Sequence, residues 1–106
     1  MSLVQLRKKI NSVDAQLIKL LGKRFLIAQT IGDLKKKHQY TIADKAREKE
    51  LTRLHESLEK KYSLSPKFTK SLWNLILKES KNLQRLQVEK MPREPLNRST
   101  KEYHSS

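Results

Sequence analysis

The chain has 106 residues and a formal net charge of +13, from 24 Lys and Arg against 11 Asp and Glu. Its length indicates one small domain, and the absence of cysteine excludes disulfides and thiolate metal sites. The histidines His38, His55 and His104 lie far apart and show no ligand spacing, which argues against a zinc or iron site. Because no apolar run approaches the roughly 20 residues of a membrane span and the N-terminus lacks the apolar core of a secretory signal, we expect a cytoplasmic protein without a membrane anchor.

The composition, with only two glycines and three prolines, favours helix throughout and predicts an all-α fold. The first predicted helix runs from about Leu3 to about His38. Its apolar residues recur at alternating steps of four and three, the heptad spacing of a helix packed lengthwise on another. They are Leu6, Ile10, Val13, Leu17, Leu20, Ile27, Ile31 and Leu34. Arg24 occupies a place in this seam that the pattern marks as apolar.

Two glycines interrupt this segment, and each costs about 1 kcal/mol in a helix interior. Gly22 and Gly32 leave open a break that would give a helical hairpin. The heptad register passes through both without a shift, which favours one continuous helix.

A loop, "KKHQYTIAD", separates this helix from a second one over about Lys45 to Lys61. Thr41 or Asp44 can cap the second helix, because a short polar side chain accepts the free N–H groups at a helix start. The apolar residues expected to point inward are Ala46, Leu51, Leu54 and Leu58.

The third predicted helix begins at "SLSP", with Ser65 as N-cap and Pro66 in the first helical position. It ends near Lys90. Its predicted buried side carries Phe68, Leu72, Leu75, Ile76, Leu83 and Leu86. Residues 1–90 thus form the predicted helical domain, and the polar tail 91–106, with two prolines and no period, is predicted to be disordered.

The length of the first helix predicts a homodimer. About 35 helical residues span roughly 50 Å, which helices of about 17 and 25 residues cannot cover. The uncovered seam needs a second copy of the chain, so we expect the first helices of two chains to pair lengthwise.

Several polar residues interrupt the apolar pattern. Arg24 and Lys35 lie eleven residues apart, so they share a helix face about 16 Å apart along the axis and together suit one small anion. Arg7 is turned by roughly 100° from Arg24 and could reach such a site only from a partner chain. Taken singly, Arg24 is better explained as an ordinary snorkelling or paired charge, and Lys35 as part of a solvated basic run; their spacing is what favours a shared site. Similar polar candidates on the later helices are Arg47, Glu48, Ser80 and Gln84.

The order and spacing of these residues resemble the all-helical class of chorismate mutases. The matching stretches are "LRKKINSVDAQLIKLLGKR", "IGDLKK", "IADKAREKEL" and "LILKESKNLQ", which together extend from about Leu3 to Gln87. The resemblance implies a three-helix, intertwined homodimer that isomerises chorismate to prephenate in aromatic amino acid biosynthesis, without a cofactor. No segment resembles a fused dehydratase, dehydrogenase or regulatory module, so we expect a monofunctional enzyme.

The resemblance also implies a role for each site residue. Arg7 would reach into the partner's site, and Arg24 would hold a substrate carboxylate. Lys35 and Gln84 would donate to the reacting ether oxygen, and Glu48 would accept from the ring hydroxyl. Asp44, Arg47 and Ser80 complete the substrate-binding set.

Two alternative functions remain to be weighed. An isochorismate-pyruvate lyase shares this fold, but its glutamate and serine positions tend to be altered, so Glu48 and Ser80 favour the mutase. A basic helical nucleic-acid-binding protein fits the net charge, but the aromatic residues are few and no recognition motif occurs, so nucleic acid is not the expected partner. A nucleic-acid-binding protein would be recognised by an affinity for nucleic acid that falls steeply as the salt concentration rises.

Overall fold

The protein is all-helical in its computed structural model, which describes residues 1–38 and 44–90. Three helices, α1 (Leu3–His38), α2 (Lys45–Lys61) and α3 (Pro66–Lys90), account for the described part of the chain, which contains no strand. The predicted fold class and helix bounds are confirmed. The predicted tail 91–106 and residues 39–43 of the predicted loop lie outside the described residues.

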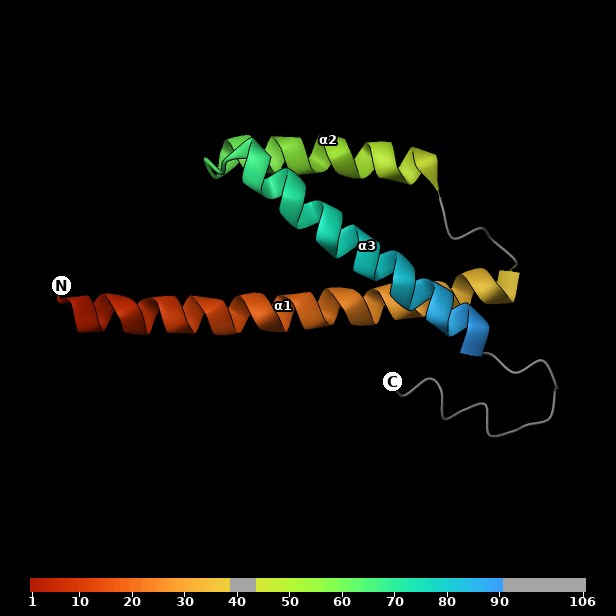
Figure 1. Ribbon diagram of the computed structural model, residues 1–106, viewed down its shortest axis with the longest axis horizontal. Helices are drawn as coiled ribbons and strands as arrows, with labels where there is room; N and C mark the ends of the chain where they lie inside the picture. Colours follow the sequence, from red (N-terminus) through yellow and green to blue (C-terminus); the bar gives the residue numbers. More distant parts are fainter. Residues whose placement is uncertain (39–43, 91–106) are drawn as a thin grey trace.

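The helices are arranged around α3, which crosses from the end of α2 to the C-terminal half of α1 (Figure 1). Most contacts between helices join α1 to α3, and fewer join α2 to α3. The N-terminal half of α1 extends past the other two helices as a free arm (Figure 1).

Gly32 lets α1 and α3 approach closely. A Cβ atom at this position would lie 2.8 Å from the Cα of Gln84 and 2.9 Å from its carbonyl oxygen, closer than real Cβ atoms lie. Beside it, Gln87 donates from Nε2 to Oδ1 of Asp33 at 2.7 Å. Gly22 has no neighbour within 4 Å. Since α1 is continuous through both glycines, the hairpin alternative is wrong.

Local hydrogen bonds fix where α2 begins and ends. The Asp44 carboxylate accepts from the Arg47 backbone N–H at 3.1 Å, which selects Asp44 as the N-cap. At the other end Ser63 has a left-handed backbone with φ of 57°. The Leu64 N–H then donates to the Glu59 carbonyl at 2.9 Å, as in a Schellman closure.

The turn between α2 and α3 is held by a buried threonine. Thr69 is 2% exposed, and its hydroxyl contacts the Glu59 carboxylate and the Ser65 carbonyl. The Phe68 N–H donates to the Ser65 hydroxyl at 3.4 Å at the start of α3.

The apolar core of one chain is small. Ala28, Leu51 and Ile76 are its buried apolar residues within the described ranges. Many residues predicted to point inward are exposed in the single chain, namely Ala46, Leu54, Leu58, Phe68, Leu75 and Leu86. Their helices bury faces that include polar residues instead: His55, Thr69, Ser80, Gln84 and Gln87.

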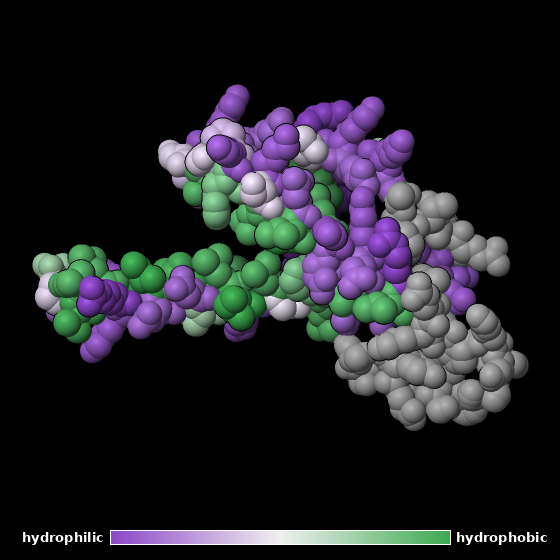
Figure 2. All heavy atoms as spheres, in the orientation of Figure 1, coloured by the Kyte–Doolittle hydropathy of each residue, from purple (hydrophilic) through white to green (hydrophobic). Residues whose placement is uncertain are grey.

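The arm of α1 is uncovered along its whole length. Every residue from 1 to 20 is exposed, and apolar side chains gather along the arm (Figure 2). Leu6, Ile10, Val13 and Leu17 of the predicted seam are between 45% and 59% exposed. None of the helices in the described ranges is long and apolar enough to cross a bilayer.

Candidate active site

Residues of all three helices line a cavity that is open to solvent and has a volume of about 810 Å³. Seven of the eight predicted site residues line it: Arg24, Lys35, Asp44, Arg47, Glu48, Ser80 and Gln84. The eighth, Arg7, is exposed on the arm of α1 and does not line the cavity. The fold thus brings together residues from positions 24 to 84 of the sequence.

Arg24 is held at the cavity wall by Ser80. The guanidinium Nη1 donates to the Ser80 hydroxyl oxygen at 2.6 Å, while the Ser80 hydroxyl donates to the Ile76 carbonyl at 2.9 Å. Because the serine proton is committed to α3, its oxygen is oriented to accept from the arginine. Ser80 therefore fixes the guanidinium and leaves its other N–H donors for a ligand.

The same guanidinium lies against an aromatic pair. The Arg24 Cζ is 5.7 Å from the centre of the Trp73 ring, within the range of a cation–π contact. The ring of His55 stacks on Trp73, with centroids 3.7 Å apart and planes 2° from parallel. Trp73 and His55 thus support Arg24 from behind the cavity wall.

Burial and neighbouring positive charges lower the pKa values of both Arg24 and His55. Burial, followed by the charge of Arg47, lowers the pKa of Arg24, although an arginine stays protonated at physiological pH. Burial also lowers the pKa of His55, and the charges of Arg24 and Arg47 lower it further, while Glu59 acts in the opposite direction. His55 is therefore favoured in its neutral form in the folded chain.

Within the described ranges, no carboxylate forms a salt bridge with Arg24. A half-buried guanidinium that faces a cavity without such a partner suits an anionic ligand, which can supply the missing charge.

Lys35 and Gln84 meet across the interface of α1 and α3. The Lys35 ammonium donates to Oε1 of Gln84 at 3.0 Å. Because the amide oxygen accepts this bond, the amide nitrogen of Gln84 is left to donate. An ammonium and an amide N–H group side by side can stabilise negative charge on a single oxygen atom.

The residues from α2 form the opposite wall of the cavity. Asp44 is engaged as the cap of α2, and Arg47 pairs with Glu50 at 2.6 Å on the exposed side. Oε2 of Glu48 lies 2.7 Å from the Lys81 ammonium of α3, and both side chains are partly exposed.

The sequence patterns did not single out Lys81, Trp73 or His55. The spacing along α3 could have indicated two of them. Lys81 lies three residues before Gln84, and Trp73 lies seven residues before Ser80, so each is on nearly the same side of the helix as a predicted site residue. His55 lies four residues after Leu51, on the buried side of α2, but a histidine there does not fit an apolar pattern.

The cavity wall carries an excess of positive charge. Lys78 and Lys81 add two cations to Arg24, Lys35 and Arg47, against the carboxylates of Asp44 and Glu48. Within the described ranges, no group of three metal-ligating side chains occurs. The arrangement suits a small ligand with more than one negative charge and one atom on which negative charge develops.

Comparisons with known proteins agree with this chemistry. The family model described as chorismate mutase type II matches residues 6–85. Three bifunctional chorismate mutase/prephenate dehydratases are similar to the chain. That of Buchnera aphidicola subsp. Baizongia pistaciae is 34% identical over 89 residues, or 84% of this chain. Those of subsp. Acyrthosiphon pisum and Schizaphis graminum are 34% and 35% identical, each over 74% of this chain. The chain spans between 20% and 24% of the length of these curated relatives.

Proposed function

Since this chain belongs to the chorismate mutase type II family, we propose that it isomerises chorismate to prephenate, a step of aromatic amino acid biosynthesis. The observation that carries this proposal is the convergence of seven expected site residues from three helices on one cavity. The reaction is a rearrangement within a single molecule, so the protein needs to supply binding, orientation and charge stabilisation.

The arginines are the proposed clamp for the two carboxylates of chorismate. Arg24 is fixed by Ser80 and Trp73, and Arg47 lines the opposite wall. A guanidinium stays charged and binds both oxygens of a carboxylate at once. Holding the flexible substrate at both ends keeps it in the compact conformation from which it rearranges, which is a proximity effect.

Lys35 and Gln84 are the proposed catalytic residues at the ether oxygen. As the carbon–oxygen bond lengthens in the transition state, negative charge grows on that oxygen. The Lys35 ammonium and the amide oxygen of Gln84 lie 3.0 Å apart in their hydrogen bond, so a ligand oxygen beside this pair can accept from the ammonium and from the amide N–H of Gln84. Their donation strengthens as the charge develops and therefore lowers the barrier.

Glu48 is the proposed acceptor for the ring hydroxyl of the substrate. It lines the same cavity, and an ionised carboxylate only accepts hydrogen bonds. This role separates the mutase from the lyase alternative, in which the glutamate and serine positions tend to be altered.

We propose that the active enzyme is a homodimer with shared sites. All residues from 1 to 20 are exposed in one chain, including the apolar seam of α1, and burial of such a surface is favourable. Arg7 lies about 25 Å along the axis from Arg24. In an antiparallel pair of α1 helices, the arm of one chain brings Arg7 beside the cavity of the other.

The test is to incubate the purified chain with chorismate and, separately, with isochorismate. We expect chorismate to be consumed and prephenate to form. Salicylate and pyruvate from isochorismate, without prephenate from chorismate, would establish the lyase instead. No conversion of either compound by a folded dimer would reject both.

A further inference from the structure

Lys81 joins the two walls of the cavity. Its ammonium lies 2.7 Å from Oε2 of Glu48, so the salt bridge connects α3 to α2. Both residues line the cavity, and their side chains are 38% and 40% exposed. The contact therefore belongs to the site itself and is partly shielded from water.

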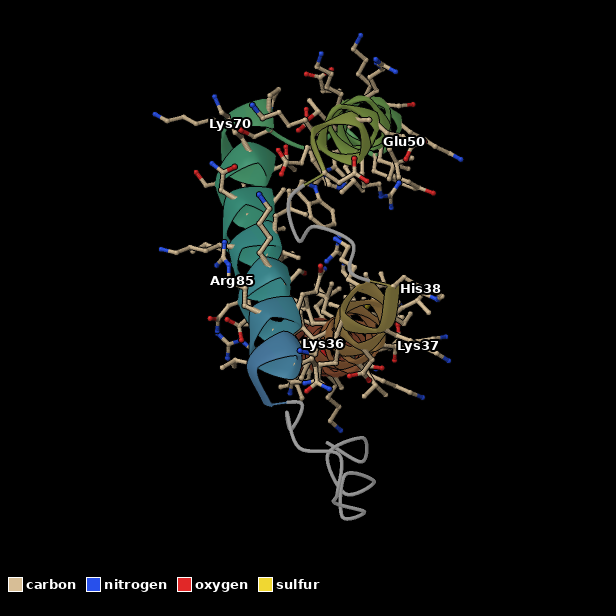
Figure 3. The ribbon with its side chains drawn as sticks, turned by 90° about the vertical axis from the view of Figure 1, so that its right-hand side faces the viewer. Lys36, Lys37, His38, Glu50, Lys70 and Arg85 are labelled. Carbon is tan, nitrogen blue, oxygen red and sulfur yellow. The ribbon has the colours of Figure 1, made fainter. Side chains whose placement is uncertain are left out.

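Lys81 is one of five cations on a single side of α3. They are Lys67, Lys70, Lys78, Lys81 and Arg85, and helical geometry places them within about 80° of one another around the axis. Within the described ranges, Lys81 is the one of these five cations that forms a salt bridge. Figure 3 shows Lys70, near the start of α3, pointing away from the other helices. Lys81 thus differs from its neighbours by its partner, Glu48.

The salt bridge addresses a charge conflict in the proposed site. A dicarboxylate ligand and the ionised Glu48 carry the same sign of charge in one small cavity, and like charges at short range repel each other. Glu48 is nevertheless useful there, because it can accept from a ligand hydroxyl. A cation beside the carboxylate offsets its charge and leaves its second oxygen, Oε1, to accept.

We propose that Lys81 is a positioning residue, which orients Glu48 and offsets its charge so that the cavity selects a dicarboxylate that also carries a hydroxyl group. This inference rests on the proposed function, since it assigns Glu48 to the ligand hydroxyl. Lys81 acts through the glutamate and not on the reacting atoms. It therefore affects substrate binding more than turnover.

A double-mutant cycle tests the inference in the full chain. Lys81→Met removes the charge and keeps the approximate size of the side chain, and Glu48→Gln removes the carboxylate charge. We expect Lys81→Met to raise KM for chorismate about tenfold, an effect limited by the partial exposure of the salt bridge to water. We expect kcat to change by less than about twofold, because Lys81 does not act on the reacting atoms. In the Glu48→Gln background the same substitution changes KM by less than about twofold, since its partner is gone.

Two further variants serve as controls. Lys81→Arg keeps the cation and restores KM to within about threefold of the unmodified chain. Lys70→Met removes one positive charge from the same side of α3 outside the cavity lining and leaves KM unchanged. Equal effects of Lys81→Met and Lys70→Met would overturn the inference. An equal effect of Lys81→Met in both backgrounds would also overturn it, because Lys81 would then act on the ligand directly.

The same cycle is measured on the dissociation constant of prephenate by calorimetry, which separates this inference from the proposed function. Prephenate binding with the expected coupling, but no turnover of chorismate, would support the inference and reject the proposed activity. Turnover with purely additive effects of the two substitutions would reject the inference alone. Neither binding nor turnover would reject both.

Discussion

The two halves of α1 have the same kind of sequence and different surroundings. Residues 21–38 lie against α3 and include the buried Ala28 and Gly32, together with Arg24 and Lys35 at the cavity. Residues 3–20 carry the same apolar heptad seam but are exposed throughout. The difference indicates that a single chain forms all of its longest helix but packs only part of it against its other helices. Substitutions in residues 21–38, the packed half, should therefore act within one chain, whereas substitutions in the arm should act on the partner's site.

The largest expected effect comes from the packed half. Lys35→Ala and Gln84→Ala are each expected to cost about 2.7–4 kcal/mol of transition-state stabilisation, by analogy with the removal of one oxyanion-hole donor. Lys37→Ala is the matched control, because Lys37 is exposed in the last turn of α1 and points away from α3 (Figure 3). The measurement is kcat/KM for chorismate. Near-normal values for both cavity variants would contradict the proposed roles.

The arm is tested by mixing two inactive chains. Arg7→Ala removes the arginine that the arm is proposed to contribute to the partner's site. Arg24→Ala removes the arginine that lines the cavity of its own chain. After subunit exchange, a mixed dimer has one site with both lesions and one with neither. We therefore expect the 1:1 mixture to recover about a quarter of the activity of the unmodified protein. Exchange that is verified by mass spectrometry but restores nothing would argue against a shared site.

Replacing either glycine of α1 by alanine is expected to change the free energy of unfolding by a smaller amount, and in opposite directions at the two positions. Gly32→Ala forces a Cβ against the backbone of α3 and is expected to destabilise the fold by about 2–3 kcal/mol. Gly22→Ala meets open space and is expected to stabilise it by up to about 1 kcal/mol. Urea unfolding at one fixed protein concentration measures both. A destabilising Gly22→Ala would mean that residue 22 contacts the partner chain.

The smallest expected effect is the pH dependence due to His55. Because the pKa of His55 is lowered in the folded chain, the unfolded chain binds its proton more readily between the folded pKa and about 6.5. Its contribution to stability is therefore complete above pH 6.5 and is lost as the pH falls toward the folded pKa. Unfolding measured at pH 7.5 and pH 5 should show a loss that is smaller in His55→Gln. An equal loss in both proteins would assign the pH dependence to other groups.

Local signals in the sequence were sufficient for the helices. A serine and a proline mark the start of α3, and the heptad register runs unbroken through Gly22 and Gly32. For α2 the sequence offered Thr41 or Asp44 as the cap, and the structure has Asp44 in that position. These signals act between residues that are close in the sequence, where hydrogen bonds and caps depend little on the rest of the fold. Seven of the residues that line the cavity were also predicted, through the resemblance of the whole pattern to a family, whereas Lys78 and Lys81 were not.

Only the tertiary structure decided which side chains meet. The pairs Arg24–Ser80, Lys35–Gln84 and Glu48–Lys81 join residues between 33 and 56 positions apart, and their contacts depend on the angle at which α3 crosses the other helices. That crossing requires Gly32, and it leaves Leu54 and Leu75 exposed while His55 and Gln84 are buried. The periodicity of a single helix defines its faces but not which neighbour covers each face, because that depends on packing between helices distant in the sequence.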